Sequence, residues 1–284
     1  MSAGRKKNIL LTGGSGFIGR NIIEYLSSKY DISAPPEEDL NLLDGLSVES
    51  FFKNQNFDVV IHAANIGEYN ASEKPNAISV KNIRMFFNLV QQLKPHQEMI
   101  FLGSGAEYDK HRDIIFITED KFGERIPTDS YGFAKYICSK YIEQSDNIIN
   151  LRCFGVYGKY EQRARFISNA IINALNQKPI IIRKNVYFDY LCVDDLVKII
   201  DFFILNKNKH KFYNAASGIR IDLITLSSLV KKIMGRKEEI IVQEHGMGKE
   251  YTADTSRLSQ EININLTSLE EGIGKLAEYY RSQH

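Results

Sequence analysis

The chain has 284 residues and a net charge of +1, which suits a globular α/β protein and gives no reason to expect nucleic acid or an anionic membrane as a partner. Cys138, Cys153 and Cys192 are widely spaced and odd in number, so they indicate neither a metal site nor a disulfide framework and fit a reducing cytoplasm. The polar start MSAGRKKN and the lack of a long apolar run argue against a signal peptide or membrane span. We therefore expect a cytoplasmic protein that binds no metal, nucleic acid or membrane.

The first predicted element is a short apolar strand, residues 9–11, that breaks into a glycine-rich turn and continues as a helix. Gly13 permits the sharp turn, Gly16 lets backbone approach a pyrophosphate, and Gly19 lets the helix lie close to the strand. The helix N-terminus offers N–H groups and partial positive charge to phosphates. The spacing is Gly-x-x-Gly-x-x-Gly, and a purely structural turn is the alternative, but the strand–turn–helix order favours dinucleotide binding. The residues expected to contact the dinucleotide here are Gly13, Ser15, Gly16, Phe17, Ile18 and Gly19.

The second predicted strand, residues 30–33, ends without the residue that distinguishes the nicotinamide cofactors. An acid at this point marks NAD and a basic residue marks NADP, but residues 33–36 supply neither. Arg20, just past the last glycine, can reach a 2′-phosphate, or else it is an ordinary solvated helix residue. The choice between NAD(H) and NADP(H) stays open, with NADP(H) slightly favoured.

A helical stretch to residue 54 leads to a third strand, residues 58–64, which ends in Ala63 and Ala64. Small side chains at this end let backbone lie against a cofactor. His62, in the same strand, is either a catalytic residue or a structural hydrogen-bonding residue, and we favour the structural role.

A helix over residues 75–93 precedes a fourth strand, residues 99–104, whose last residue is Ser104. Ligands of doubly wound sheets bind beyond the carboxyl ends of such strands. Tyr131 and Lys135 follow at a spacing of four, so they share one face of a helix that Asp129 or Ser130 can cap. We expect the Lys135 ammonium to lower the pKa of the Tyr131 phenol and to make it a proton donor and acceptor suited to carbonyl chemistry.

The alternation of strands and helices in the first half predicts a doubly wound parallel sheet, a Rossmann domain, over residues 1–154. Part of residues 186–210 is expected to return to it, and residues 155–284 are expected to form mainly a smaller, discontinuous substrate-binding lobe. The elements expected after residue 147 are a strand at 148–154, a loop at 155–158, a helix at 166–175, a strand at 179–182, a strand and turn at 211–218, and helices at 223–234 and 268–280.

The ordered set of motifs resembles the extended short-chain dehydrogenase/reductase family in its nucleotide-sugar epimerase/dehydratase branch. The run Leu40 to Asp44 is especially similar to GDP-fucose synthases and 4-keto-6-deoxyhexose reductases. The matching motifs are the glycine turn at 12–19, Leu42-Leu-Asp44, His62-Ala-Ala64, Asn82, Phe101-Leu-Gly-Ser104 with Tyr108 four residues later, Tyr131-x-x-x-Lys135, Arg152-x-Phe-x-x-Tyr-Gly158 and Val193-Asp-Asp195.

The resemblance implies a catalytic triad of Ser104, Tyr131 and Lys135 acting on a sugar carbonyl or hydroxyl. In reduction, Tyr131 protonates the oxygen at C4, Ser104 hydrogen-bonds the same oxygen, and Lys135 binds the nicotinamide ribose. The resemblance also implies a homodimer that pairs helices around Phe86 and Tyr136. Further cofactor contacts that it implies are Asp44, Ala63, Ala64 and Asn82.

Departures from the family pattern narrow the reaction. The 4,6-dehydratases carry an Asp-Glu pair after the serine, but Gly105 and Ala106 stand here and cannot transfer a proton. Glu107 is one residue late and, in a strand-like segment, would point to the other face. The cysteine and histidine that epimerise in GDP-fucose synthases fall at Ala106 and near Arg165. The expected reaction is therefore 4-keto reduction, with C4 epimerisation as the alternative and a dehydratase or non-catalytic cofactor-binding relative less favoured.

The substrate is expected to be a nucleotide sugar. The family's phosphate-binding Asn and Arg are replaced by Gly155 and Phe188, so other cations would have to substitute, or those cations are ordinary surface residues. The expected substrate contacts are Ser104, Gly105, Ala106, Phe154, Arg163, Arg165 and Arg183.

Overall fold

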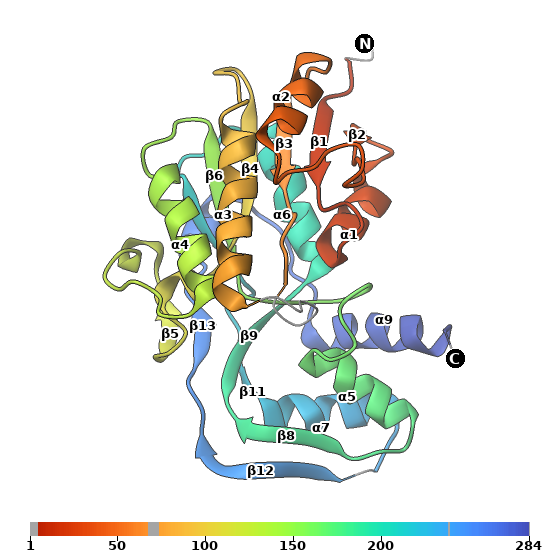
Figure 1. The fold of residues 1–284 in the computed structure, drawn as a ribbon. Coiled ribbons are helices and arrows are strands. Elements are labelled where there is room, and N and C mark those ends of the chain that lie inside the picture. Colours follow the sequence, from red (N-terminus) through yellow and green to blue (C-terminus); the bar gives the residue numbers. More distant parts are fainter. Residues whose placement is uncertain (1–4, 68–73, 238, 284) are drawn as a thin grey trace.

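Six parallel strands form the main sheet of the computed structural model, which describes residues 5–67, 74–237 and 239–283 (Figure 1). Residues 1–4, part of the polar N-terminal stretch, lie outside the described residues. The strands lie in the order β10-β6-β4-β3-β1-β2. From β1, the chain adds β2 on one side and β3, β4, β6 and β10 on the other, as in doubly wound sheets. The strands are β1 (Asn8–Thr12), β2 (Asp31–Ser33), β3 (Val59–His62), β4 (Glu98–Ser104), β6 (Ile148–Cys153) and β10 (Phe212–Ala215).

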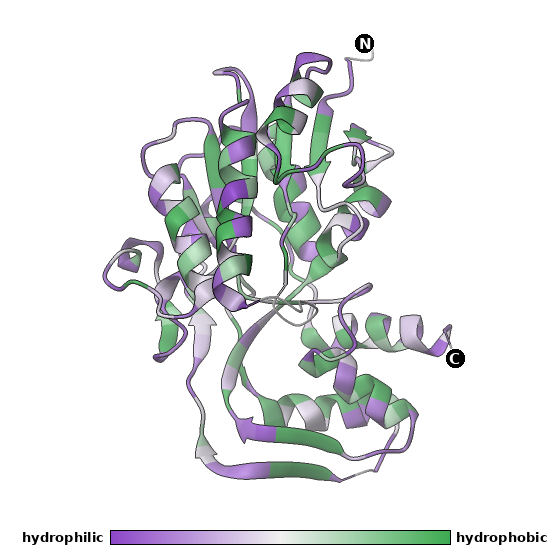
Figure 2. Cartoon of the chain, in the orientation of Figure 1, coloured by the Kyte–Doolittle hydropathy of each residue, from purple (hydrophilic) through white to green (hydrophobic). Residues whose placement is uncertain are grey.

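Successive side chains of each strand point to opposite faces of this sheet, so both faces are apolar and both are covered by helices. Ile9 and Leu11 lie in one hydrophobic cluster with residues of α1 and α6, whereas Leu10 lies in another with residues of α2, α3 and α4. Figure 2 shows the matching hydrophobic strands between the helices. The predicted doubly wound fold is confirmed. The covering helices are α1 (Phe17–Leu26), α2 (Gly45–Lys53), α3 (Pro75–Val90), α4 (Ser130–Ile142) and α6 (Val193–Leu205).

A second group of elements lies beyond the carboxyl ends of the parallel strands (Figure 1). Three helices share one hydrophobic cluster with β8 and β9, while β8 and β12 form a parallel ribbon. These three helices are α5 (Phe166–Leu175), α7 (Leu223–Met234) and α9 (Leu269–Arg281). The short helix α8 (Ser256–Glu261) packs instead on β10 of the main sheet. The strands are β5 (Ile114–Ile117), β7 (Gly155–Tyr157), β8 (Ile180–Asn185), β9 (Tyr187–Cys192), β11 (Arg220–Asp222), β12 (Ile240–Met247) and β13 (Tyr251–Ala253).

Two local expectations are wrong. Residues 155–157 are not a loop but strand β7, because they pair in parallel with β9, more than thirty positions later. Glu107 does not lie in a strand-like segment, since residues Gly105–Tyr108 form the 3-10 helix η2, which Ser104 caps. A second 3-10 helix, η3, spans Glu119–Lys121.

None of the described helices has the length and apolar content that crossing a bilayer requires.

Candidate active site

The glycine turn is shaped by close backbone contacts. Gly13 has a φ of +74°, and a Cβ on it would lie 2.6 Å from the Ala64 nitrogen at the end of β3. A Cβ on Gly19 would lie 2.1 Å from the Gly13 carbonyl oxygen. Both positions therefore require glycine if α1 is to lie against the turn and the turn against Ala63 and Ala64.

The start of α1 has the features of an anion site. Gly16 caps the helix without any side-chain hydrogen bond, so the N–H groups of the first turn can bind an anion. Ser15 and Gly16 are exposed there, whereas the side chains of Phe17 and Ile18 pack on the core. Arg20 is exposed, and its guanidinium stacks 3.6 Å from the centroid of the Tyr160 ring.

The end of β3 is braced by buried polar groups. His62 Nδ1 lies 2.7 Å from Thr12 Oγ1, which also accepts the Ala64 N–H at 3.3 Å. Burial lowers the pKa of His62 to about 3, with a smaller contribution from the Lys135 charge, so His62 is neutral at pH 7. Asn82 Oδ1 accepts the Ile66 N–H and its Nδ2 donates to the Ile66 carbonyl.

Asp44, the other cofactor contact implied by the resemblance, is exposed and caps α2 by accepting the Leu46 N–H.

The three triad residues come from β4 and α4, and a hydrogen bond from Lys135 joins the two elements. Ser104 ends β4, and its hydroxyl oxygen accepts the Ala106 N–H at 3.1 Å. Asp129 caps α4, as expected, and places Tyr131 in the first turn. Lys135 Nζ donates to the Leu102 carbonyl of β4 at 2.8 Å.

The phenol of Tyr131 is neutral, and the Ser104 side chain acts on its pKa. Burial raises the pKa of Tyr131 to about 12, while a hydrogen bond with the Ser104 side chain acts in the opposite direction. The expectation that Lys135 lowers the pKa of Tyr131 is wrong for this structure, because burial dominates and the ammonium is turned to the Leu102 carbonyl. Burial also lowers the pKa of Lys135.

An aromatic wall, defined as Phe154, Phe188, Tyr190 and Tyr251, stands beside Ser104. The Tyr251 hydroxyl lies 3.5 Å from Ser104 Oγ, and its ring centroid lies 4.7 Å from that of Phe154. A Cβ on Gly105 would come within 2.6 Å of both Phe154 and Tyr251, so any larger residue there would displace these two rings. Of the wall, sequence reasoning expected a site role for Phe154 alone. Tyr251 was missed because it is 147 positions from Ser104 and lies in no motif.

Gly155 and Phe188, which replace the phosphate-binding Asn and Arg of the family, lie within the aromatic wall or against it. A Cβ on Gly155 would lie 2.5 Å from the Asp189 carbonyl oxygen, so an asparagine does not fit on this backbone. Phe188 packs against Tyr190 at 5.6 Å and Tyr251 at 5.5 Å between ring centroids.

The three arginines expected to hold phosphates lie in different surroundings. Arg165 Nε pairs with Glu161 at 3.0 Å, and its charge acts on the Tyr131 phenol. Arg163 donates to Gln283, and Arg183 pairs with Glu244 across the β8–β12 ribbon at 2.7 Å. Arg165 alone of the three is thus linked electrostatically to the triad by the described interactions.

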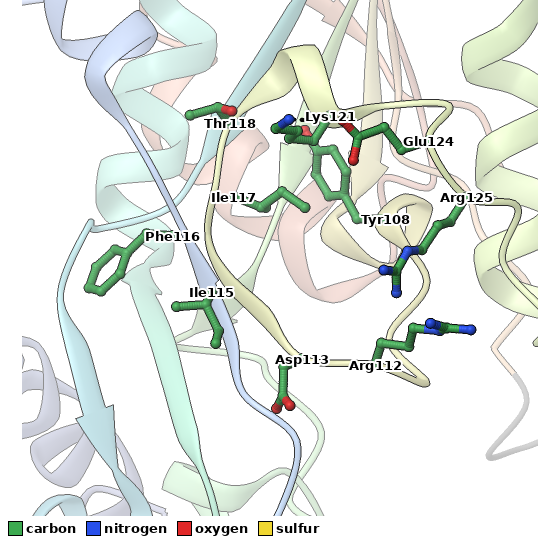
Figure 3. A pocket seen from close by; sticks show the side chains of 10 residues that line it. All are labelled: Tyr108, Arg112, Asp113, Ile115, Phe116, Ile117, Thr118, Lys121, Glu124 and Arg125. Atoms are coloured by element: carbon green, nitrogen blue, oxygen red, sulfur yellow. Dashed lines mark hydrogen bonds and ion pairs between the residues drawn. The ribbon is translucent and has the colours of Figure 1, made fainter.

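A cavity of about 310 Å³ lies on the segment that follows η2 (Figure 3). Ten residues between 108 and 125 line it, so the triad residues lie outside it. Within residues 5–67, 74–237 and 239–283, no three His, Cys, Asp or Glu side chains cluster as metal ligands would.

Comparison with known proteins gives the family. Residues 9–216 match the NAD dependent epimerase/dehydratase family. The chain is 26% identical to the GDP-L-colitose synthase of Yersinia pseudotuberculosis, over 97% of this chain and 98% of that protein. The UDP-glucose 4-epimerase of Thermotoga maritima has a similar fold, with a TM-score of 0.84 and 22% identity over 97% of this chain and 99% of that one.

The structure of RMD from Pseudomonas aeruginosa complexed with NADPH is also similar, with a TM-score of 0.84 and 19% identity over 98% of this chain and 99% of that one. Because the family match spans most of the sequence, this chain belongs to the NAD dependent epimerase/dehydratase family, within the extended short-chain dehydrogenases/reductases that its motifs resemble.

Proposed function

We propose that this protein reduces the C4 keto group of a nucleotide-activated 6-deoxy sugar, with NADPH slightly favoured over NADH. The observation that carries the proposal is the placement of Ser104 at the end of β4 beside α4, which carries Tyr131 in its first turn and Lys135 one turn further on, with Lys135 bonded to the Leu102 carbonyl of β4. The Ser104 side chain also lowers the pKa of Tyr131 against the larger effect of burial. The similarity to a GDP-L-colitose synthase over nearly the whole chain supports a nucleotide-linked deoxy sugar as substrate.

The residues of the glycine turn fit a dinucleotide. Gly13 and Gly19 keep the turn free of Cβ atoms, and the first turn of α1 presents N–H groups that can bind a diphosphate. The small Ala63 and Ala64 border the same turn. A bound nicotinamide dinucleotide supplies the hydride for the reduction, and the similar RMD fold in complex with NADPH supports this assignment.

Tyr131 is the proposed proton donor. Its raised pKa keeps the phenol protonated at neutral pH, so it can give its proton to the sugar O4 as hydride adds to C4 and the ketone becomes an alcohol. The Ser104 oxygen accepts the Ala106 N–H, and the Ser104 O–H is the proposed donor that stabilises the negative charge developing on O4. Lys135 is proposed to bind the nicotinamide ribose.

The sugar is proposed to lie between Ser104 and the residues 155–284, with Gly105, Ala106 and Phe154 beside it. Arg165 is the proposed phosphate contact, because its charge reaches Tyr131. Dehydration is disfavoured, since neither Gly105 nor Ala106 can transfer a proton.

C4 epimerisation is the second candidate, because the same three residues suffice to oxidise and re-reduce one carbon. The likeness to the Thermotoga maritima UDP-glucose 4-epimerase favours retaining it. An epimerase keeps its nicotinamide cofactor through purification and consumes none, whereas a reductase consumes added cofactor in proportion to product.

A panel of 4-keto nucleotide sugars with GDP, CDP, UDP or dTDP, each tested with NADPH and NADH, is the direct test of the proposal. Loss of nicotinamide absorbance with one substrate, and formation of the C4 alcohol, is the expected result. A panel without any loss, together with interconversion of C4 epimers by the enzyme as purified, would favour the second candidate.

We also propose that the protein works as a cytoplasmic homodimer built on α3 and α4. Large hydrophobic side chains stand exposed on these helices, namely Val80, Phe133 and Tyr141.

A further inference from the structure

Glu107 is a fully buried carboxylate directly behind the catalytic serine. It lies on η2, three residues after Ser104, and is 0% exposed. A buried carboxylate is tolerated only where hydrogen bonds and an opposite charge surround it. Arg152 supplies that charge, with its Nε 2.7 Å from Glu107 Oε2. The carboxylate is thus fixed in one place by a buried partner.

One oxygen of this carboxylate holds the serine backbone. Glu107 Oε1 accepts the Ser104 N–H at 3.0 Å and lies 3.2 Å from Asn150 Nδ2. The bond to the Ser104 N–H and the Ser104 cap on η2 together form a reciprocal capping box. The backbone that carries the serine hydroxyl therefore cannot move without breaking a bond to Glu107.

The other oxygen holds the catalytic helix. Glu107 Oε2 accepts the Ser139 hydroxyl at 2.6 Å, and Ser139 is buried on α4. Tyr131, Lys135 and Ser139 are spaced by four, so they share one face of that helix. A single carboxylate thus bonds both elements that carry the triad.

We propose that Glu107 is a positioning residue, whose carboxylate ties Ser104 to α4 through Ser139 and so holds the serine hydroxyl against the Tyr131 phenol. The proposal rests on the proposed reductase function. The alternative is that the buried Glu107–Arg152 pair only stabilises the fold and does not position the serine. The two explanations differ in their effect on turnover, because misplacing a reacting group by a fraction of an ångström slows the chemical step without weakening cofactor binding.

Ser139→Ala is the informative variant, since it removes the bond between Glu107 and α4, together with the bond that Asn150 Nδ2 donates to Ser139 Oγ at 2.6 Å, and leaves the Glu107–Arg152 pair intact. Its matched control is Ser227→Ala on α7, which removes a buried serine hydrogen bond of similar length, 2.7 Å to the Leu223 carbonyl. Glu107→Gln is a second variant: it keeps an oxygen acceptor but leaves Arg152 without its charge partner, so its melting temperature is measured first.

The experiment measures kcat, KM and the Kd for NADPH of the whole protein, with wild type and Tyr131→Phe as references. We expect Ser139→Ala to lower kcat about tenfold with an unchanged Kd for NADPH, while Ser227→Ala lowers only the melting temperature. An active wild type, an inactive Tyr131→Phe and a Ser139→Ala variant within twofold of wild-type kcat would overturn the positioning role alone. A wild type without turnover on any 4-keto nucleotide sugar would overturn both this role and the proposed function.

Discussion

His62 has a pKa of about 3 in the folded protein because burial disfavours its charged form and the Lys135 charge acts in the same direction. An unfolded histidine has a pKa of about 6.5. Below that value the unfolded chain takes up a proton that the folded protein refuses, so the stabilisation from His62 is complete above about pH 6.5 and is lost as the pH falls toward 3.

Replacing His62 by Asn tests this. The difference in unfolding free energy between wild type and His62→Asn should shrink by about 1.4 kcal/mol for each pH unit below 6. Urea unfolding of both proteins at several values between pH 7 and pH 4 measures it. A difference that does not change with pH would mean that His62 binds a proton as readily in the folded protein as in the unfolded chain.

Tyr251 places a third hydroxyl at the site, 3.5 Å from Ser104 Oγ. Tyr251→Phe keeps the ring that packs on Phe154 and Phe188 and removes only that hydroxyl. Because a hydrogen bond of this length is weak, we expect kcat/KM for the sugar to fall about fivefold, with cofactor binding unchanged. Steady-state kinetics at saturating NADPH provide the measurement, and an unaltered kcat/KM would show that the hydroxyl does not contribute.

The strand–turn–helix element at β1 and α1 depends on Gly13, whose φ is +74° and whose Cβ would strike the backbone of Ala63 and Ala64. Gly13→Ala should cost more than 1 kcal/mol of stability and abolish measurable NADPH binding, because the turn must shift away from β3. Isothermal titration with NADPH and thermal unfolding report the two effects.

Gly235→Ala is the matched control for this element. Gly235 also has a positive φ, +64°, at the end of α7, but a Cβ on it meets nothing within 4 Å. The control should lose stability and keep NADPH binding. If Gly13→Ala binds NADPH as well as Gly235→Ala does, the glycine turn is not the dinucleotide site.

Local pattern was enough to predict the elements that carry the triad. The apolar run ending in Ser104 and the capped helix of Tyr131 and Lys135 are visible within a few residues. Strand β7 was not predicted, because three residues form a strand only through pairing with β9. Tyr251 lies on an equally short strand, β13, held by β5 and β9. Such contacts depend on distant pairing rather than on local periodicity.

Glu107 shows a second limit of the sequence. The prediction that Glu107 points to the other face assumed regular strand geometry, but the chain turns into η2 at Gly105. Whether an ionisable side chain faces solvent or a buried partner depends on that turn. The raised pKa of Tyr131 has a similar origin, because it depends mainly on burial. The sequence spacing of Tyr131 and Lys135 does not show how deeply the phenol is buried.

At the scale of the whole molecule, the carboxyl ends of the parallel strands face the second group of elements (Figure 1). This leaves the outer surfaces of α3 and α4 free to meet a second copy. Phe133 is 41% exposed and Tyr141 is 40% exposed on α4. Exposed aromatic side chains of this kind are typical of interfaces.

The double variant Phe133→Glu with Tyr141→Glu should therefore convert the proposed homodimer to a monomer, because two charges would be buried at the interface on dimerisation. Light scattering after gel filtration gives the mass of each protein. A wild type that is already monomeric would contradict the dimer.

The most direct test of the reductase mechanism compares wild type with Tyr131→Phe on an accepted 4-keto nucleotide sugar and NADPH. We predict that wild type consumes one equivalent of NADPH for each C4 alcohol formed. The variant should lose at least about a hundredfold in kcat while binding NADPH normally, because only the proton donor is missing. A variant that turns over like wild type, or product formed without consumption of nicotinamide, would contradict the account.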